Sequence, residues 1–218
     1  MGKATRSRAR STGAGAAAPA HSRIASEEEL GVVEALRQGD EEAFARLVDQ
    51  HHASLHRIAR LYVSDASIAD EVVQDTWLGV IQGVWAFEGR SSLRTWILRI
   101  LVNRAKTRAL RESRTTPFAD LGLVDLEAPE AALDRARREP SPEVELLAQE
   151  TLEHIRKAID ALPANQRIVL TMRDVEGFSS EEICSVLGIR ETNQRVLLHR
   201  ARANVRATLQ PYLGRRGT

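Results

Sequence analysis

Residues 179–209, SSEEICSVLGIRETNQRVLLHRARANVRATL, have the pattern of a helix-turn-helix. Ser179 precedes Glu182 by the spacing of a capping box, so a helix is expected to begin there. Gly188 is placed to supply the turn, and a longer helix is expected from about Glu191. At about 100° per residue, the apolar positions of this second helix share one stripe that must face a core. They are Leu198, Ala201, Val205 and Leu209.

The opposite face of the second helix carries hydrogen-bond donors and positive charge. Its residues are Thr192, Asn193, Val196, His199 and Arg200, with Arg195, Arg202 and Arg206 on the flank. Arg and Asn side chains make bidentate contacts with base edges in the major groove, and flanking Arg side chains neutralise phosphates. The pattern therefore favours DNA reading, with an amphipathic helix of an ordinary helical bundle as the alternative.

The composition favours an all-α protein with two domains. The 218 residues are 43% hydrophobic, which suffices for a core, and only 4% aromatic. The net charge is +1, yet 99–114 and 190–216 are basic whereas 27–42 and 120–153 are acidic. This partition suits two polyanion contacts joined by an acidic segment. The single cysteine, Cys184, excludes an internal disulfide and fits a reducing cytoplasm, and no apolar run approaches the length of a membrane span.

Helical periodicity predicts two small helical domains joined by a flexible acidic linker. Residues 1–25 are predicted to form a disordered basic tail and 26–112 the first domain. Prolines interrupt 113–143, which is the predicted linker, and helical pattern resumes in 144–213. The helix-turn-helix belongs to this second domain.

Four helices are expected in the first domain. Ser26 and Asp40 cap the first two, the third begins near Ile68, and the fourth spans Leu93 to about Glu112. The third helix is expected to pack through Val72, Val73, Leu78 and Ile81. An aromatic loop, VWAFEGRSS, connects the last two helices.

Three segments carry the most specific signal. They are ADEVVQDTW at 69–77, FEGRSSLRTWILRILVN at 87–103, and 162–202, which contains LP, EEI, LG and HRAR. In this order and spacing the chain resembles the extracytoplasmic-function sigma factors, the small initiation subunits of bacterial RNA polymerase. In that family the segments bind the polymerase clamp, hold the minus-10 element and read the minus-35 element. The likeness covers about 40–114 and 144–209.

The resemblance implies three sets of contact residues. A helix face for the coiled coil of the clamp would consist of Asp70, Glu71, Gln74 and Asp75. The minus-10 contacts would be Phe87, Trp96, Arg99, Asn103, Arg104 and Lys106. The minus-35 contacts would be Arg190, Asn193, Arg195, Val196, His199 and Arg200. An aromatic floor and an amide edge suit the capture of an unstacked base, although Trp96 shares its side with Ile97 and Ile100 and could equally belong to the core.

By the same resemblance, the protein would be a cytoplasmic factor without enzymatic activity or cofactor. Its partners would be core RNA polymerase, promoter DNA and an anti-sigma factor. Two alternatives stay open. The first is an enzyme with a metal site on the second helix. His52 and His56 lie one turn apart beside His51, but no third metal ligand is evident. The second is a stand-alone helix-turn-helix regulator, which would bind duplex DNA tightly without polymerase.

One polar residue of the helix-turn-helix is placed unfavourably. Gln194 lies near the buried stripe of the second helix, where its amide needs a hydrogen-bond partner.

Overall fold

The computed structural model describes residues 24–115 and 142–214, and within these ranges all regular structure is helical. The predicted fold class, two small helical domains with a helix-turn-helix in the second, is confirmed. The predicted tail falls outside the described residues except for its last two positions, and the predicted acidic linker falls outside them except at its ends. Among the described residues, no helix is both long enough and apolar enough to cross a bilayer.

The N-terminal domain begins with helices that are capped as their sequence predicts. Its elements are α1 (Glu27–Arg37), α2 (Glu41–Ala59), α3 (Ala66–Gly83), the 3-10 turn η1 (Val84–Ala86) and α4 (Leu93–Thr115). Ser26 and Glu29 form a reciprocal capping box, and Asp40 accepts a hydrogen bond from the backbone of Ala43. Helix α3 begins two residues before the predicted Ile68, because Asp65 caps it through the backbone N–H of Ser67.

Helices α2, α3 and α4 enclose the core of this domain. Its most deeply buried side chains include Ile58, Val73, Val80, Ile97, Leu98 and Leu101. The prediction that Leu78 and Ile81 face this core is wrong, since both are about half exposed. The inward positions of α3 are occupied instead by Thr76, Trp77 and Val80, which continue the stripe of Val72 and Val73 along the helix.

The C-terminal domain contains the helix-turn-helix. Its elements are α5 (Pro142–Asp160), α6 (Ala164–Leu170), one π-helical turn η3 (Thr171–Val175), α7 (Ser180–Leu187) and α8 (Glu191–Gly214). The predicted capping box of Ser179 and Glu182 is present. Gly188 ends α7 with a φ of 70°, a left-handed conformation that glycine adopts without strain.

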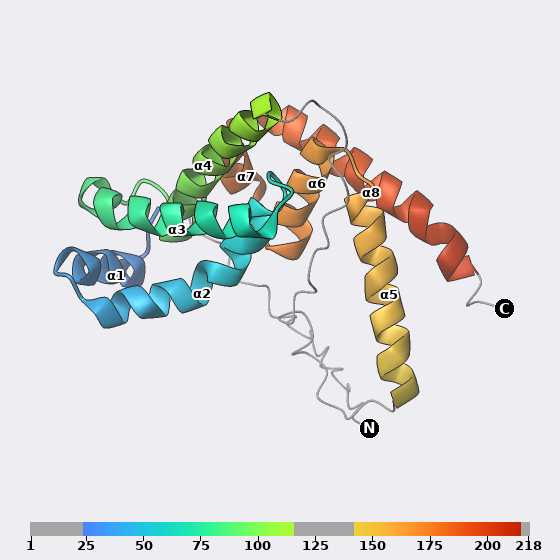
Figure 1. The fold of residues 1–218 in the computed structure, drawn as a ribbon, viewed down its shortest axis with the longest axis horizontal. Coiled ribbons are helices and arrows are strands. Elements are labelled where there is room, and N and C mark those ends of the chain that lie inside the picture. The colour runs from blue at the N-terminus through green and yellow to red at the C-terminus, as the bar shows by residue number, and fades with distance from the viewer. Residues whose placement is uncertain (1–23, 116–141, 215–218) are drawn as a thin grey trace, which may run out of the picture.

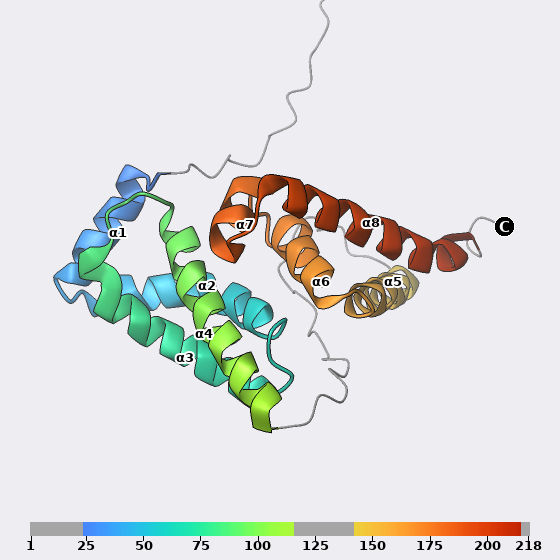
Figure 2. The same cartoon turned by 90° about the horizontal axis from the view of Figure 1, so that it is seen from above.

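The two domains lie against each other through α4 and α7. Figure 1 shows α1 to α4 grouped together, with α5 and α8 extending away from them. In the second view α7 faces α4, and α6 and α8 lie beyond it (Figure 2). The start of the helix-turn-helix therefore touches the helix that follows the aromatic loop.

Candidate nucleic-acid interface

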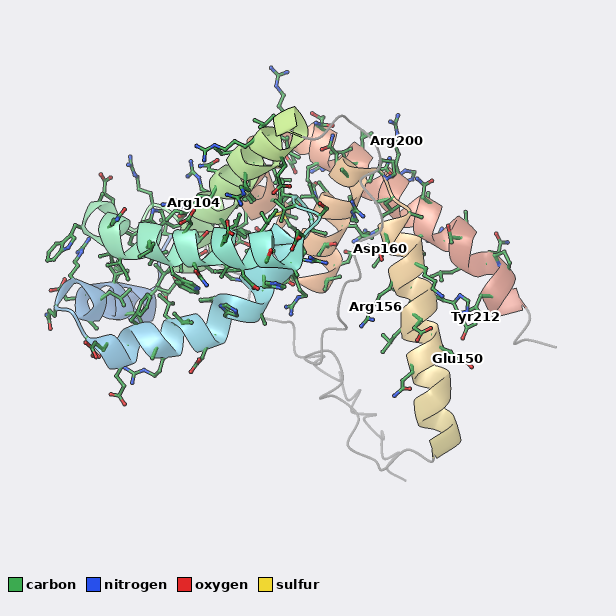
Figure 3. All side chains as sticks on the ribbon, viewed as in Figure 1. Arg104, Glu150, Arg156, Asp160, Arg200 and Tyr212 are labelled. Atoms are coloured by element: carbon green, nitrogen blue, oxygen red, sulfur yellow. The ribbon has the colours of Figure 1, made fainter. Side chains whose placement is uncertain are left out.

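The predicted reading face of α8 is exposed. Arg190, Asn193, Arg195, Val196, His199 and Arg200 all lie at the surface, while Leu198 and Ala201 are buried on the opposite side. Arg200 projects outward from α8 (Figure 3). Arg195 is held by Glu191, one turn earlier, at 2.5 Å. The helix thus has one buried apolar stripe and one donor-rich stripe, as its sequence predicts.

The flank of α8 is partly engaged within the domain. Arg202 donates two hydrogen bonds to Asp174, at 2.9 and 2.6 Å, and this carboxylate raises the pKa of the guanidinium. Arg173 donates to the backbone oxygen of Phe178 at 2.7 Å. The bonds from Arg202 fix the π-helical turn against α8, and the bond from Arg173 fixes the segment that follows the turn. Arg202 is therefore engaged within the domain.

Gln194 is the polar residue that the sequence places near the buried stripe of α8, where its amide needs a hydrogen-bond partner. Its side chain is 0% exposed, and within the described ranges neither its amide oxygen nor its amide nitrogen has a hydrogen-bond partner. It borders a groove that is also lined by Ser180, His199 and Arg206. A buried amide without partners lowers stability, since it has lost its bonds to water.

The aromatic part of the predicted minus-10 site is packed within the protein. Phe87 is only 5% exposed, and its ring centroid lies 5.2 Å from that of the partly buried Trp96. Arg37 of α1 fixes this loop by donating to the backbone oxygens of Val84 and Phe87. Trp96 therefore contributes to packing while keeping part of its ring at the surface.

The polar part of the predicted minus-10 site forms a stripe on α4. Arg99, Asn103 and Lys106 are exposed and follow Trp96 at spacings of three, four and three residues, which places them on one side of the helix. Lys106 donates from Nζ to the backbone oxygen of Leu187 at 3.4 Å. The C-terminal end of this stripe is therefore in contact with α7.

The predicted clamp residues are exposed, but two of them pair with α4. Arg108 contacts Glu71 at 2.7 Å, and Arg104 lies 3.9 Å from Asp75, across a groove that Asn103 also lines. Figure 3 shows Arg104 on α4 above α3. The predicted DNA-binding and polymerase-binding side chains therefore meet across one groove.

An exposed apolar row extends the acidic face of α3, and sequence reasoning missed it. Leu78, Ile81 and Trp85 are exposed, with Trp85 at 70%. Leu78 and Ile81 follow Glu71 and Gln74 at alternating spacings of three and four residues, so these polar and apolar groups share one side of α3, and Trp85 follows in η1. Exposed apolar rows of this kind mark interaction surfaces. The spacing was visible in the sequence, but the same spacing also fits a core stripe.

One of the histidines of α2 that the sequence offers as metal ligands is paired with a carboxylate. His56 contacts Asp70 at 3.2 Å, and among the residues that the structure describes no group of metal-binding side chains is present. Burial, together with nearby Arg94, lowers the pKa of His51 to about 4, against the opposing effect of Glu29. His51 is therefore a neutral packed side chain at ordinary pH.

The comparisons with known proteins agree with this geometry. Residues 47–115 match the family Sigma-70 region 2, and residues 152–205 match Sigma-70, region 4. The fold and the two matched regions together define a sigma factor with Sigma-70 regions 2 and 4.

The similar proteins identify the group. The chain is 31% identical over 191 residues to the RNA polymerase sigma-H factor of Pseudomonas aeruginosa, covering 87% of this chain and 98% of that protein. It is 28% identical over 184 residues to the ECF RNA polymerase sigma-E factor of Escherichia coli, covering 84% and 95%. The chain belongs to the extracytoplasmic-function sigma factors. It is a promoter-recognising sigma factor of RNA polymerase, an initiation factor and not an enzyme.

Solved structures share the fold. CnrH in complex with the cytosolic domain of CnrY is 22% identical, with a TM-score of 0.57, and the match covers 85% of this chain and 99% of that one. The sigma factor RpoE in complex with the anti-sigma factor NepR, from Bartonella quintana, is 20% identical, with a TM-score of 0.59 and coverage of 77% and 96%. At these identities the likeness concerns the fold alone.

Proposed function

We propose that the two domains divide promoter recognition between them. Residues 26–112 bind the polymerase clamp and the minus-10 element, residues 144–213 read the minus-35 element, and 113–143 join them. The observation that carries this proposal is the presence of exposed donor stripes on two separate helices, α4 and α8. Two promoter elements require two such surfaces.

In the C-terminal domain, Arg195, Val196, His199 and Arg200 contact the bases of the minus-35 element. Arg190 and Asn193 lie at the start of α8, where side chains reach base edges first when a recognition helix enters the major groove. Exposure of all these positions supports the assignment. Val196 supplies the apolar surface that can contact a thymine methyl group.

In the N-terminal domain, Asn103 captures a base of the opened minus-10 element. Arg99, Arg104 and Lys106 follow the phosphates beside it, and Trp96 on the same side of α4 offers the ring that a base can reach. Phe87 packs beneath Trp96, so its part in the pocket is to support that ring. Stacking on an aromatic ring contributes roughly 1–3 kcal/mol per base, comparable with the cost of unstacking.

Helix α3 docks on the coiled coil of the clamp. Asp70, Glu71, Gln74 and Asp75 supply polar contacts, and the exposed row of Leu78, Ile81 and Trp85 supplies the apolar area. The alternating spacing of this side suits a coiled-coil partner, whose own contact residues repeat at the same spacing. Apolar area is what a durable interface needs beside charge.

A transcription assay tests the division of labour. Purified core polymerase, this protein and candidate promoters should give template-specific transcripts that require the protein. Asn103→Ala should lose transcription and permanganate reactivity on linear duplex but recover on a template already opened across the minus-10 element. Asn204→Ala is the matched control, because this exposed amide on α8 pairs with Gln166 away from the reading face.

The outcomes separate the alternatives. Equal transcription from duplex by Asn103→Ala and the wild type would refute the pocket. Tight binding to a symmetric duplex site without polymerase, together with no dependence of transcription on this protein, would favour a stand-alone regulator.

An anti-sigma factor is the proposed regulator, acting in the cytoplasm where polymerase and DNA are found. Support comes from the two solved structures of the same fold, which were determined with CnrY and with the anti-sigma factor NepR. A pull-down from cells in which the factor is silent should return such a protein. Recovery of polymerase alone would contradict this.

A further inference from the structure

The aromatic loop, residues 84–92, is held by α1 at both of its ends. At the first end, Arg37 donates from Nε to the backbone oxygen of Val84 at 3.3 Å and from Nη2 to that of Phe87 at 2.9 Å. Its Nη1 lies 3.7 Å from the carboxylate of Glu34, one turn earlier on α1. All three nitrogens of the guanidinium therefore have an oxygen neighbour, which fixes the orientation of the group.

At the second end, Glu29 in the first turn of α1 caps two helices at once. Its Oε2 accepts from the backbone N–H of Ser26 at 2.9 Å and completes the capping box of α1. Its Oε1 accepts from the backbone N–H of Leu93, the first residue of α4, also at 2.9 Å. The first N–H groups of a helix have no partner within that helix. One carboxylate thus fixes the starts of α1 and α4 relative to each other.

The middle of the loop also lies against the start of α1. The backbone N–H of Ala25 donates to the backbone oxygen of Gly89 at 3.0 Å. Gly89 has a φ of 71°, and a Cβ at this position would lie 3.3 Å from Cδ2 of Leu30. A residue without a side chain is therefore required here both by the conformation and by the close approach of α1. Figure 2 shows the chain between α3 and α4 passing beside α1.

Both ends of the loop lead to Trp96, the ring assigned to an unstacked base. Arg37 binds the backbone of Phe87, whose ring centroid lies 5.2 Å from that of Trp96. Glu29 binds Leu93, which lies three positions before Trp96 in the first turn of α4. The place of this ring is therefore set from α1 by two separate routes.

We propose that Arg37 and Glu29 are positioning residues for the minus-10 pocket. They fix the aromatic loop and the start of α4, and they act on DNA only through Trp96 and Asn103. Helix α1 precedes residues 47–115, which match Sigma-70 region 2, so the helix that shapes the loop lies before the matched region. The role in base capture rests on the proposed minus-10 function, whereas the support of the loop by α1 does not.

Base capture makes the order of this loop important. The gain from stacking a base on an aromatic ring is comparable with the cost of unstacking that base from DNA. A loop that became ordered only at that moment would add its own loss of conformational entropy to the cost. A loop that α1 already holds avoids this addition, and promoter opening is favoured.

The test compares Arg37→Met with Arg46→Met in the full-length chain. Methionine keeps an apolar stem but donates no hydrogen bond. Arg46 of α2 is the matched control, because its side chain is 64% exposed and its ion pair joins it to Glu42 of its own helix. Hydrogen exchange of the backbone amides of 84–96, read by mass spectrometry without polymerase or DNA, measures the order of the loop. Transcription is then compared on linear duplex and on a template already opened across the minus-10 element.

We expect Arg37→Met to speed exchange in the loop and to lower transcription from linear duplex, each by about tenfold, the ratio that one lost hydrogen bond to a charged group produces. Transcription from the opened template should recover, and binding to core polymerase should be unchanged. Arg37→Lys keeps a charged donor and should restore part of the loss. Arg46→Met should change none of these quantities.

Glu29→Gln tests the other end of the loop and replaces Arg37→Met should that variant fail to fold by circular dichroism. Glutamine offers one acceptor oxygen where the carboxylate uses two, so it cannot hold Ser26 and Leu93 as Glu29 does. Exchange in the loop should again be faster and transcription from linear duplex lower. Glu28→Gln, at an exposed neighbouring position of α1, is the control and should change neither.

Three outcomes overturn the proposal. Unchanged exchange in both variants overturns the support of the loop by α1. Faster exchange with unchanged transcription from linear duplex, while Asn103→Ala is impaired, overturns the role in base capture. An equal loss on both templates overturns it too, because a general defect in folding or polymerase binding produces that result. Failure of the proposed function is distinct, since Asn103→Ala itself would then transcribe linear duplex like the wild type.

Discussion

The two DNA-facing helices differ in how far their side chains are engaged before DNA arrives. On α8 the reading face is open, and Arg195 pairs only with its neighbour Glu191 among the described residues. On α4, Arg104 lies beside Asp75 of α3 and Lys106 reaches Leu187 of α7, whereas Arg99 and Asn103 are exposed. Within the described ranges, no hydrogen bond or ion pair joins the donors of the reading face of α8 to another helix, whereas part of the donor stripe of α4 is already bound within the protein. A helix packed between two neighbours therefore uses some of its donors within the fold, whereas a helix at the edge of its domain keeps them.

The largest expected effect on stability distinguishes Phe87 from Val196, the apolar side chains predicted to contact the minus-10 and the minus-35 element. Phe87→Ala should lower the free energy of unfolding by about 3–5 kcal/mol, since it empties a packed site. Val196→Ala should change it by less than about 0.5 kcal/mol, since Val196 is 46% exposed. Urea denaturation followed by circular dichroism measures both. Equal, small losses would show that the aromatic loop is as open as the reading face of α8.

A second pair of variants sharpens the comparison within α8. Arg200→Ala should weaken binding to the minus-35 element by about 1–3 kcal/mol and relax preference at one base pair. Arg202→Ala should leave that preference unchanged and lower stability by up to about 1 kcal/mol, because Arg202 holds Asp174. Transcription from promoters with single minus-35 substitutions is the measurement. A matching loss of base preference in both variants would contradict the division of α8 into reading face and flank.

The burial of His51 in the N-terminal domain should make the free energy of unfolding depend on pH. His51 has a pKa of about 4 in the folded chain against 6.5 unfolded, because it is buried near Arg94. As the pH falls, His51 therefore takes up a proton in the unfolded chain before it does so in the folded chain. This contribution, on the order of 1–3 kcal/mol, is complete above pH 6.5 and is lost as the pH falls to about 4. His51→Gln should flatten that slope in urea denaturation, and an unchanged slope would mean that His51 is solvated.

The smallest effect concerns the buried side of α8. Gln194→Leu should raise the free energy of unfolding by about 1 kcal/mol, because it replaces a buried amide without partners by an apolar group of similar size. Gln210→Leu, at an exposed position of the same helix, should give no gain. Thermal denaturation compares the two. A loss of stability in Gln194→Leu would reveal that the amide is satisfied and that α8 is packed differently from the structure.

Sequence patterns within a few residues predicted the helix-turn-helix in detail. The capping box of Ser179 and Glu182, the turn at Gly188 and the two faces of α8 all follow from helical geometry. The same reasoning placed Gln194 on the buried side, where the structure has it. For α3 it placed Val72 and Val73 correctly but assigned Leu78 and Ile81 to the core, because they have the spacing of core residues and only the direction of docking decides between two apolar sides.

The sequence alone determined the helices, their caps, the family and the open reading face of α8, because each depends on residues within about one or two turns of one another or on motifs in a fixed order. Tertiary structure alone decided the burial of Phe87, the outward position of Leu78 and Ile81 on α3, and the contact of Glu176, which follows the π-helical turn, with Arg57 of α2 and Arg94 of α4. Arg57 and Glu176 are 119 positions apart in the chain, and no local pattern brings such residues together. Their meeting depends on how two separately folded surfaces fit.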